Sequence, residues 1–405
     1  MPRVGWVKPS ADERLTDHVG IGVLTSLFPP GLVDALVEAR GRREQRSRLA
    51  PARVAVYFTL ALALFSDASY GEVARQLAGG LEWESGWARR WSVPGKSSLF
   101  RARRRLGAGV LEDLFREVAR PLAERGAAGA WLAGRRLVAV DGTVLDVPDT
   151  PENAAEFGRH GSKDGTVTAF PQVRVVALGE CATLAELGAV VGGCQEPEVA
   201  LARGLLGGLD ASMALVADRS FYSYDLWRDA AETGCALVWR VKGNMVLPVL
   251  EELADGSYLS RIRPSDRARR RAGESAAVRV VEYAVEDGDA APASYRLITN
   301  LLDPTEAPAR DIAEAYHLRW RIETAFDELK SHERSPGVAL RSKSPDLVRQ
   351  EVWAYLCVHY AIRWLIASAL AHSGASPDRG SFTAALRASR RSVITHQGFS
   401  PLRAG

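Results

Sequence analysis

Four polar residues that could bind a metal ion or DNA phosphates share one side of a predicted helix. The segment YHLRWRIETAFDELKSH has an apolar stripe at helical spacing, made of Leu318, Ile322, Ala325, Phe326 and Leu329. At about 100° per residue, a second stripe spans about 60° and contains Tyr316, Arg319, Glu323 and Lys330. An ordinary surface helix explains an Arg319–Glu323 ion pair, but it does not explain why tyrosine and lysine extend the same line. The helix therefore predicts a site that combines a metal ligand with phosphate-binding side chains.

Two aspartates stand where predicted strands end. Asp141 follows the apolar segment RRLVAV, and Asp218 follows MALVA. A strand end holds a carboxylate on rigid backbone, but aspartate is also common where a strand turns, so each residue alone is compatible with a structural role. Two such aspartates on neighbouring strands favour a functional site over a structural role. Asp146 and Asp149 are interpreted as turn residues.

Three carboxylates from separate segments suit a hard divalent cation. Oxygen ligands favour Mg²⁺ or Mn²⁺, which keep water or substrate phosphate in their remaining positions. Two such ions activate a water or a 3′-hydroxyl and stabilise the leaving oxygen of a phosphoryl transfer. We therefore expect a two-metal site at Asp141, Asp218 and Glu323, with Arg319 and Lys330 on the flanking phosphates.

An α/β fold is predicted around these residues. From Arg135 onward, alternating β-branched segments interleave with helical ones, which indicates a sheet with buried strands. A long helix is expected from Ala309 to about His332, and a buried one from Ser344 to about His372. The predicted divisions are a helical N-terminal domain (1–128), the first part of a catalytic core (129–243), a β-rich insertion (244–293), the second part of the core (294–372) and a C-terminal tail (373–405).

A basic stripe marks the helical N-terminal region. Between Ser85 and Leu111 the sequence has seven Lys or Arg residues and no Asp or Glu. Its short helices resemble a helix-turn-helix in which Arg101, Arg103 and Arg104 face DNA. A solvated face on an ordinary helical domain has the same composition, so both interpretations stay open.

Composition and short motifs narrow the class of protein. The net charge is +3 and 47% of residues are hydrophobic, as in a globular protein. Four scattered cysteines without a CxxC pair argue against a disulfide scaffold and a structural zinc site. The sequence lacks P-loop, GxSxG and HExxH motifs, so nucleotide hydrolysis, serine hydrolase and zinc protease chemistry have no support. A charged N-terminus and the lack of a membrane-length apolar run predict a cytoplasmic protein.

The spacing Tyr316-x2-Arg319-x3-Glu323-x6-Lys330 resembles the Tyr-Arg-Glu-Lys signature of IS4-type transposases without departure. The segments VAVDGTVLDVPDTPENAAEFGR and VADRSFYSYDLW are similar to the two aspartate motifs of that family, in the same chain order. The resemblance extends from Leu15 to His372 and includes an IS4-type N-terminal domain.

This resemblance implies an RNase H-like core with a β-rich insertion, preceded by a helical DNA-binding domain. It also implies Mg²⁺-dependent cleavage at terminal inverted repeats, joining of the ends to target DNA, and a homodimer on double-stranded DNA. Lys242 is a further candidate for a phosphate contact. Family members can cut the second strand through a DNA hairpin, with an aromatic side chain holding a flipped base. Tyr295 is the first candidate and Trp239 the second, although both could equally be core aromatics.

Two alternatives to transposition remain compatible with the sequence. An RNase H-like nuclease without strand transfer needs the same ligands, because water and a 3′-hydroxyl attack in the same way. An inactive or domesticated copy could act only as a sequence-specific DNA-binding protein. The basic N-terminal domain and the insertion favour transposition, and the intact set of carboxylates and basic residues argues against a decayed site.

Overall fold

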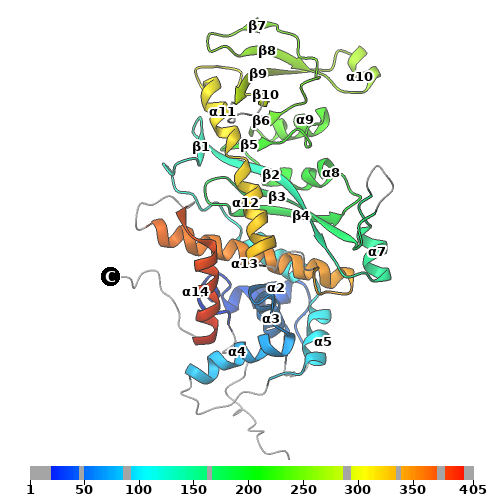
Figure 1. The fold of residues 1–405 in the computed structure, drawn as a ribbon, viewed down its shortest axis with the longest axis vertical. Coiled ribbons are helices and arrows are strands. Elements are labelled where there is room, and N and C mark those ends of the chain that lie inside the picture. Colours follow the sequence, from blue (N-terminus) through cyan, green and yellow to red (C-terminus); the bar gives the residue numbers. More distant parts are fainter. Residues whose placement is uncertain are drawn as a thin grey trace, which may run out of the picture.

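The computed structural model describes residues 20–44, 50–84, 93–161, 167–285, 293–333, 339–371 and 379–395 of the 405-residue chain. Figure 1 shows three tiers along the long axis: helices at one end, a mixed α/β layer in the middle, and further strands at the other end. The first 19 residues, part of the predicted basic stripe (85–92) and the last ten residues of the predicted tail lie outside the described residues.

Helices form the N-terminal tier. They are η1 (Gly22–Ser26), α2 (Pro30–Ala39), α3 (Ala52–Leu64), α4 (Tyr70–Glu84), α5 (Lys96–Leu106) and α6 (Gly109–Val118). Because α3 is apolar nearly all round, it lies at the centre, and twelve of its residues are buried. The expected helical N-terminal region is therefore present.

The middle tier is a mixed sheet with helices on both faces. Its strands are β1 (Trp131–Leu132), β2 (Arg135–Asp146), β3 (Gln172–Glu180), β4 (Glu186–Gly193), β5 (Met213–Ala217) and β6 (Ala236–Arg240). Its connections contain α7 (Pro151–Phe157), α8 (Glu198–Ala202), η2 (Arg203–Gly208) and α9 (Tyr224–Glu232). The strand order is β4-β3-β2-β5-β6, with β2, β5 and β6 parallel to one another and β3 antiparallel to β2 and β4. This arrangement confirms the expected RNase H-like core.

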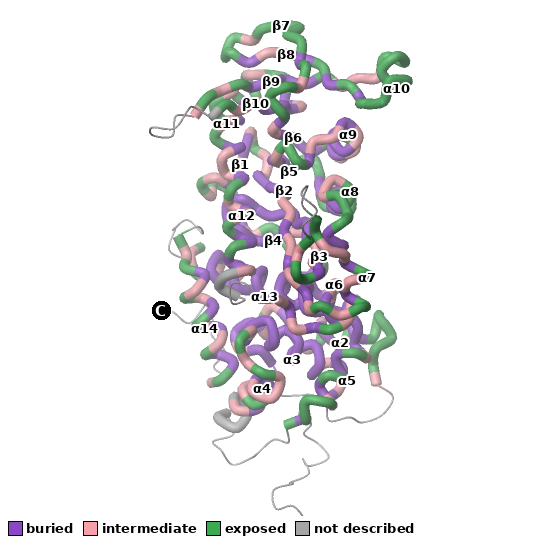
Figure 2. The backbone as a smooth tube through the Cα atoms, turned by 45° about the vertical axis from the view of Figure 1, so that its right-hand side comes forward, coloured by how far each residue is buried: buried purple, intermediate pink, exposed green. Residues whose placement is uncertain are grey.

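The interval predicted as a β-rich insertion extends the same sheet. It contains β7 (Glu251–Glu252), β8 (Tyr258–Ile262), α10 (Arg267–Arg271) and β9 (Ala276–Val285), followed by β10 (Ala293–Thr299). β10 pairs with β6, so the path continues β6-β10-β9-β8-β7 and the sheet has ten strands with β1. Figure 2 shows that α10 and β7 are mostly exposed at the far end.

The C-terminal third contains α11 (Ala309–His317), α12 (Trp320–Asp327), η3 (Glu328–Glu333), α13 (Pro345–Ala371) and α14 (Phe382–Thr395). The single helix expected from Ala309 to about His332 was wrong, because it is broken twice. Hydrogen bonds three residues apart tighten the chain around Leu318 and Arg319, and η3 is a wider π-helical turn.

The buried helix expected from Ser344 is confirmed as α13, which lies between the two lower tiers (Figure 1). It packs on α3 and α6 of the N-terminal tier and on β4 of the sheet. By length and composition α13 could cross a membrane, but 67% of its apolar window is buried inside the protein, as in the core helix of a globular fold.

The segment predicted as a C-terminal tail contains a packed helix. α14 contacts η1 and α4, and its Ser392 hydroxyl accepts a 2.9 Å hydrogen bond from the backbone N–H of Val23. The chain therefore returns to its own N-terminal tier after completing the sheet.

Candidate active site

Asp141 of β2 and Asp218, which directly follows β5, lie side by side at the centre of the sheet. The expectation that Asp141 ends its strand was wrong, because β2 continues to Asp146 through its pairing with β3. β2 and β5 are parallel neighbours, and Val140 is the register partner of Ala217. Asp141 and Asp218 each follow one of these partners, at a point where adjacent strands lie about 4.8 Å apart. The residues two positions earlier on each strand pack in the core beneath α11–α13, so both aspartates belong to that face of the sheet.

α12 crosses the same face and carries Glu323. Its neighbour Ile322 is buried against Gly179 of β3, where a Cβ atom would lie only 3.2 Å from the Ile322 Cδ1 atom. The glycine therefore allows the helix to approach the sheet closely. Glu323 itself keeps 38% of its side chain exposed, so it can reach a substrate.

Arg319 links two of the three carboxylates. Its Nη2 donates a 2.8 Å hydrogen bond to Oε1 of Glu323, and its Nη1 lies 3.8 Å from Oδ2 of Asp141. The residue is only 4% exposed, and its guanidinium lies 4.8 Å from the ring centroid of Trp320. This buried cation therefore offsets the repulsion between Asp141 and Glu323. The predicted contacts of Arg319 and Tyr316 with DNA phosphates do not fit this arrangement, because the two residues are only 4% and 1% exposed.

Tyr316 reaches the third carboxylate. Its hydroxyl donates to Oδ1 of Asp218 over 3.4 Å, a long hydrogen bond. Burial and the adjacent Asp218 raise the pKa of Tyr316 to about 12, so the phenol keeps its proton at neutral pH. Lys330 lies half-buried in η3, beyond the end of α12.

Burial dominates the electrostatics of Asp141. It raises the pKa of this carboxyl to about 6, and Glu323 and Glu198 add to the shift. A hydrogen bond from the backbone N–H of Gly142 and the positive charge of Arg319 act in the opposite direction. A carboxyl group with a raised pKa beside other acids is an environment in which a nearby cation is strongly favoured.

The three carboxylates fit a divalent metal ion by their chemistry. They supply hard oxygen ligands, and a bound cation would stabilise the charged form of Asp141 against the burial and the neighbouring acids that raise its pKa. Within the described residues, no three His, Cys, Asp or Glu side chains already converge as a metal cluster. Arg319 lies between Asp141 and Glu323, so convergence on an ion requires a shift of side chains.

Arg103 was wrongly predicted to face DNA. It is 1% exposed, and its guanidinium donates to the Tyr70 hydroxyl, to Gln350 Oε1 at 2.7 Å and to the backbone oxygen of Leu347 at 3.4 Å. Helical spacing explains the error, because Arg103 lies on the side of α5 that packs in the core with Leu99. Arg101 and Arg104 are exposed on the other side of α5.

The other predicted contacts lie near the beginning of the extended part of the sheet. Lys242 is exposed just after β6. Tyr295 of β10 is half-buried and stacks on Tyr283, with ring centroids 5.2 Å apart. Trp239 is 1% exposed and packs on Trp227, which makes it a core residue rather than a base-stacking one.

Two residues near the site were missed in the sequence. Glu198 of α8 lies on the opposite face of the sheet and forms a 2.8 Å ion pair with Arg174. Its carboxylate occupies the space of the side chain that Gly142 lacks, since a Cβ there would lie 2.7 Å from Oε1. Arg240 covers the Tyr295 ring at 4.3 Å. The glycine after Asp141 was the available signal for Glu198, whereas nothing local marked Arg240.

Comparison with known proteins gives the same assignment for both halves of the chain. Residues 18–116 match the family described as insertion element 4 transposase N-terminal, and residues 132–361 match the transposase DDE domain. The second match covers more than half of the sequence. The chain belongs to the IS4 family of DDE transposases.

Curated relatives of this transposase come from Escherichia coli K12. It is 27% identical to "Transposase InsG for insertion sequence element IS4" over 388 residues, which cover 93% of this chain and 85% of that protein. It is 31% identical to "Putative transposase InsZ" over 169 residues, covering 42% and 55% of the two chains. Among solved structures, a cryo-EM structure of the piggyBac transposase synaptic complex with hairpin DNA aligns over 92% of this transposase and 80% of that chain. Its TM-score is 0.48 and its identity 12%.

The family is that of DNA-cleaving enzymes that depend on divalent metal ions. The transposase therefore acts on DNA, and the carboxylate cluster on the α12 face of the sheet is its candidate active site.

Proposed function

We propose that Asp141, Asp218 and Glu323 are the metal ligands of this transposase, and that they bind two Mg²⁺ or Mn²⁺ ions. The observation that carries this proposal is the set of contacts from one helical segment. Arg319 contacts both Asp141 and Glu323, and Tyr316 contacts Asp218. These contacts link carboxylates from three segments distant in the sequence, which supports the proposal.

The chemistry that follows is cleavage at the terminal inverted repeats and joining of the ends to target DNA. Bound divalent ions would lower the pKa of an attacking water or 3′-hydroxyl and stabilise the leaving oxygen. Arg319 keeps a positive charge between Asp141 and Glu323, and Tyr316 orients Asp218 through its protonated phenol. Lys330 is proposed to bind a phosphate beside the cut.

Double-stranded DNA is proposed to lie along the exposed basic side chains Arg101, Arg104 and Lys242. Tyr295 remains the candidate for stacking on a flipped base, supported by its half-exposed ring. Tyr283 stacks on this ring and Arg240 covers it, so a base would have to displace one of these two side chains. A homodimer that holds two ends, and action in the bacterial cytoplasm, complete the proposal.

The test uses a DNA fragment that carries the flanks of the gene, incubated with the transposase and Mg²⁺. Replacing Asp141, Asp218 or Glu323 by alanine is expected to abolish cutting while binding of the fragment stays nearly unchanged. Asp149→Ala is the matched control, because this acid follows the same strand but pairs with Arg159 at the surface. Both cutting and binding should survive that change.

Each other outcome has a distinct meaning. Cutting that persists in one alanine variant removes that residue from the site. Cuts without joined products favour a nuclease without strand transfer. Binding without cuts in both Mg²⁺ and Mn²⁺ favours a copy that acts only as a DNA-binding protein.

A further inference from the structure

Four charged side chains form a buried cluster behind α12, outside the candidate active site. They are Glu186 of β4, Glu328 of η3, and His359 and Arg363 of α13. Glu186 and His359 are fully buried, and Arg363 is 2% exposed. A buried charge destabilises the folded state unless it is paired, so each of these side chains needs a partner of opposite charge.

The four side chains are paired with one another. His359 Nδ1 lies 2.7 Å from Glu186 Oε2, and its Nε2 lies 3.2 Å from Glu328 Oε2. Arg363 binds Glu328 with both arms of its guanidinium, through Nε at 2.9 Å and through Nη2. Glu186 and Glu328 raise the pKa of His359 to about 10 despite its burial, so two negative charges meet two positive ones.

Glu328 occupies the position at which the catalytic helix changes its geometry. α12 ends at Asp327, and the π-helical turn η3 begins at Glu328, two residues before Lys330. A π turn is rare and often marks a functional site. The forked ion pair to Arg363 therefore fixes the residue with which this turn begins.

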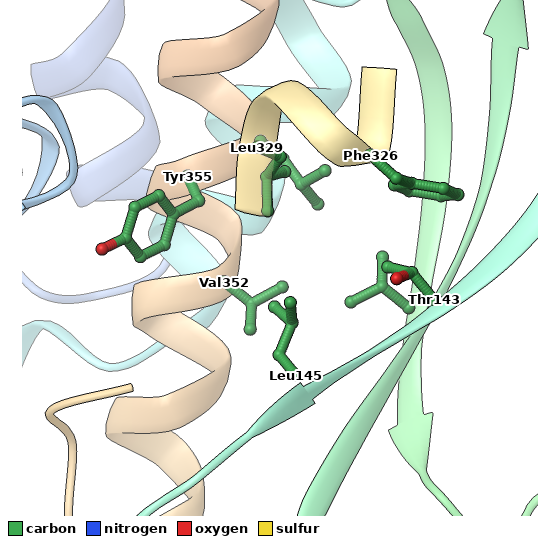
Figure 3. A pocket seen from close by; sticks show the side chains of 8 residues that line it. Thr143, Leu145, Phe326, Leu329, Val352 and Tyr355 are labelled. Carbon is green, nitrogen blue, oxygen red and sulfur yellow. The ribbon is translucent and has the colours of Figure 1, made fainter. Parts of the chain in front are cut away.

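The next residue is held as well. Leu329 is buried, and with Phe326 it lines an apolar pocket between β2 and α13, whose lining also includes Val352 and Tyr355 (Figure 3). Glu328 and Leu329, both held by contacts with the rest of the fold, thus immediately precede Lys330 in the chain.

The cluster also contacts the last helix. Phe382 of α14 stacks on His359 with ring centroids 5.0 Å apart, and the Arg363 guanidinium lies 5.4 Å from the same ring. α14 in turn packs on the N-terminal tier, where Arg390 donates a 2.6 Å hydrogen bond to the backbone oxygen of Leu64. The cluster thus joins the catalytic helix to the tier that contains α5.

We propose that Glu186, His359, Glu328 and Arg363 are positioning residues that hold the π-helical turn and thereby aim Lys330 at the DNA. This inference rests on the proposed role of Lys330 in phosphate binding. The buried ionic cluster then affects the rate of strand cleavage as well as the stability of the fold.

The experiment is a double-mutant cycle on cleavage of the gene's own flanks at saturating DNA and Mg²⁺. Glu328→Gln is expected to slow cleavage on the order of tenfold, because small displacements of a phosphate-binding group cost this much or more. Lys330→Gln should also slow cleavage, and Glu328→Gln should add little once Lys330 is gone. The dissociation constant for the flanks should stay within about twofold in Glu328→Gln.

Glu351→Gln is the matched control. This buried acid also lies on α13, but it accepts hydrogen bonds from the backbone N–H groups of Arg341 and Ser342, which lie outside η3. We expect it to lower the melting temperature without slowing cleavage at saturating DNA. Should Glu328→Gln fail to fold, Arg363→Lys gives the milder test, because lysine keeps the charge but loses the forked contact.

Two results would overturn the inference. An equal loss of rate from Glu328→Gln in the wild-type and Lys330→Gln backgrounds means that Glu328 does not act through Lys330, while the proposed active site stands. Unchanged cleavage in Lys330→Gln removes the role of Lys330 and the inference together. Cutting that survives Glu323→Ala in the same assay identifies failure of the proposed metal site instead.

Discussion

At the scale of single residues, one guanidinium organises the candidate site. Arg319 is almost fully buried, yet it contacts two carboxylates that belong to β2 and α12. Its fork can serve both at once, which the single ammonium of lysine cannot do in the same geometry. The contact from Tyr316 to Asp218 is longer and involves a neutral donor, so it is expected to contribute less.

We therefore predict different effects from two conservative substitutions. Arg319→Lys should slow single-turnover cleavage by about a hundredfold, since misplaced charge at a reacting centre is costly. Tyr316→Phe should slow it by about tenfold or less, because one weak hydrogen bond is lost. Rates measured at saturating DNA and Mg²⁺ check the order, and a larger loss from Tyr316→Phe would contradict it.

At the scale of elements, the segment α11–α12–η3 (309–333) shows which helical features follow from the local sequence and which depend on tertiary contacts. Apolar residues at helical spacing produce α11 and α12, as the pattern predicts. The breaks at Leu318 and Glu328 depend on partners outside the segment: Leu318 packs above Gly129, and Glu328 is paired with α13. Both contacts lie where the α-helical hydrogen-bond pattern changes.

The buried cluster gives this element a pH dependence of stability. The pKa of His359 is raised from its usual 6.5 to about 10 in the folded state. A histidine that binds its proton more tightly when folded stabilises the fold fully below pH 6.5 and loses that contribution as pH rises through about 10. The free energy of unfolding should therefore fall between these two pH values.

Chemical unfolding of the wild type and of His359→Gln at several pH values checks this prediction. Since tyrosine and lysine also titrate near pH 10, the informative quantity is the difference between the two proteins. This difference should shrink as pH rises from 6.5 to 10. A constant difference over that range would contradict the protonated histidine.

At the scale of the whole molecule, α13 is the common support of the N-terminal helices and the sheet. Arg103 of α5 binds Gln350 of α13, which in turn donates to the backbone oxygens of Arg103 and Gly107. The helix that carries the exposed Arg101 and Arg104 is thus tied to the support of the catalytic sheet. The proposed DNA-binding helix and the proposed metal site therefore belong to one packed body.

Replacing Arg101 and Arg104 together by alanine should weaken binding of the flanks and reduce the slope of log affinity against log salt by about 2. Arg116→Ala is the control, because this exposed arginine of α6 already pairs with Glu112. Binding that is unchanged without Arg101 and Arg104 would place the DNA-reading surface elsewhere.

Arg103→Ala should instead lower the free energy of unfolding by about 2 kcal/mol or more, since buried hydrogen bonds to a charged group are lost.

The sequence by itself determined the parts that depend on residue type and short spacing. Asp141 and Asp218 directly follow segments that alternate like strands, and Tyr316, Arg319, Glu323 and Lys330 are set by helical periodicity. These patterns predicted the α/β core, the N-terminal helices and the family, because each is encoded within a few turns or one strand.

Only the tertiary structure decided which charged residues face inward and where the long helix breaks. Arg103 and Gln350 are 247 residues apart in the chain, and Glu186 and His359 are 173 apart. A local pattern cannot show such pairings, so an arginine on a basic helix is interpreted as exposed until its distant partner is known. The helix α14 and the π turn at Glu328 could not be predicted from local patterns either, because both are stabilised by contacts with residues distant in the sequence.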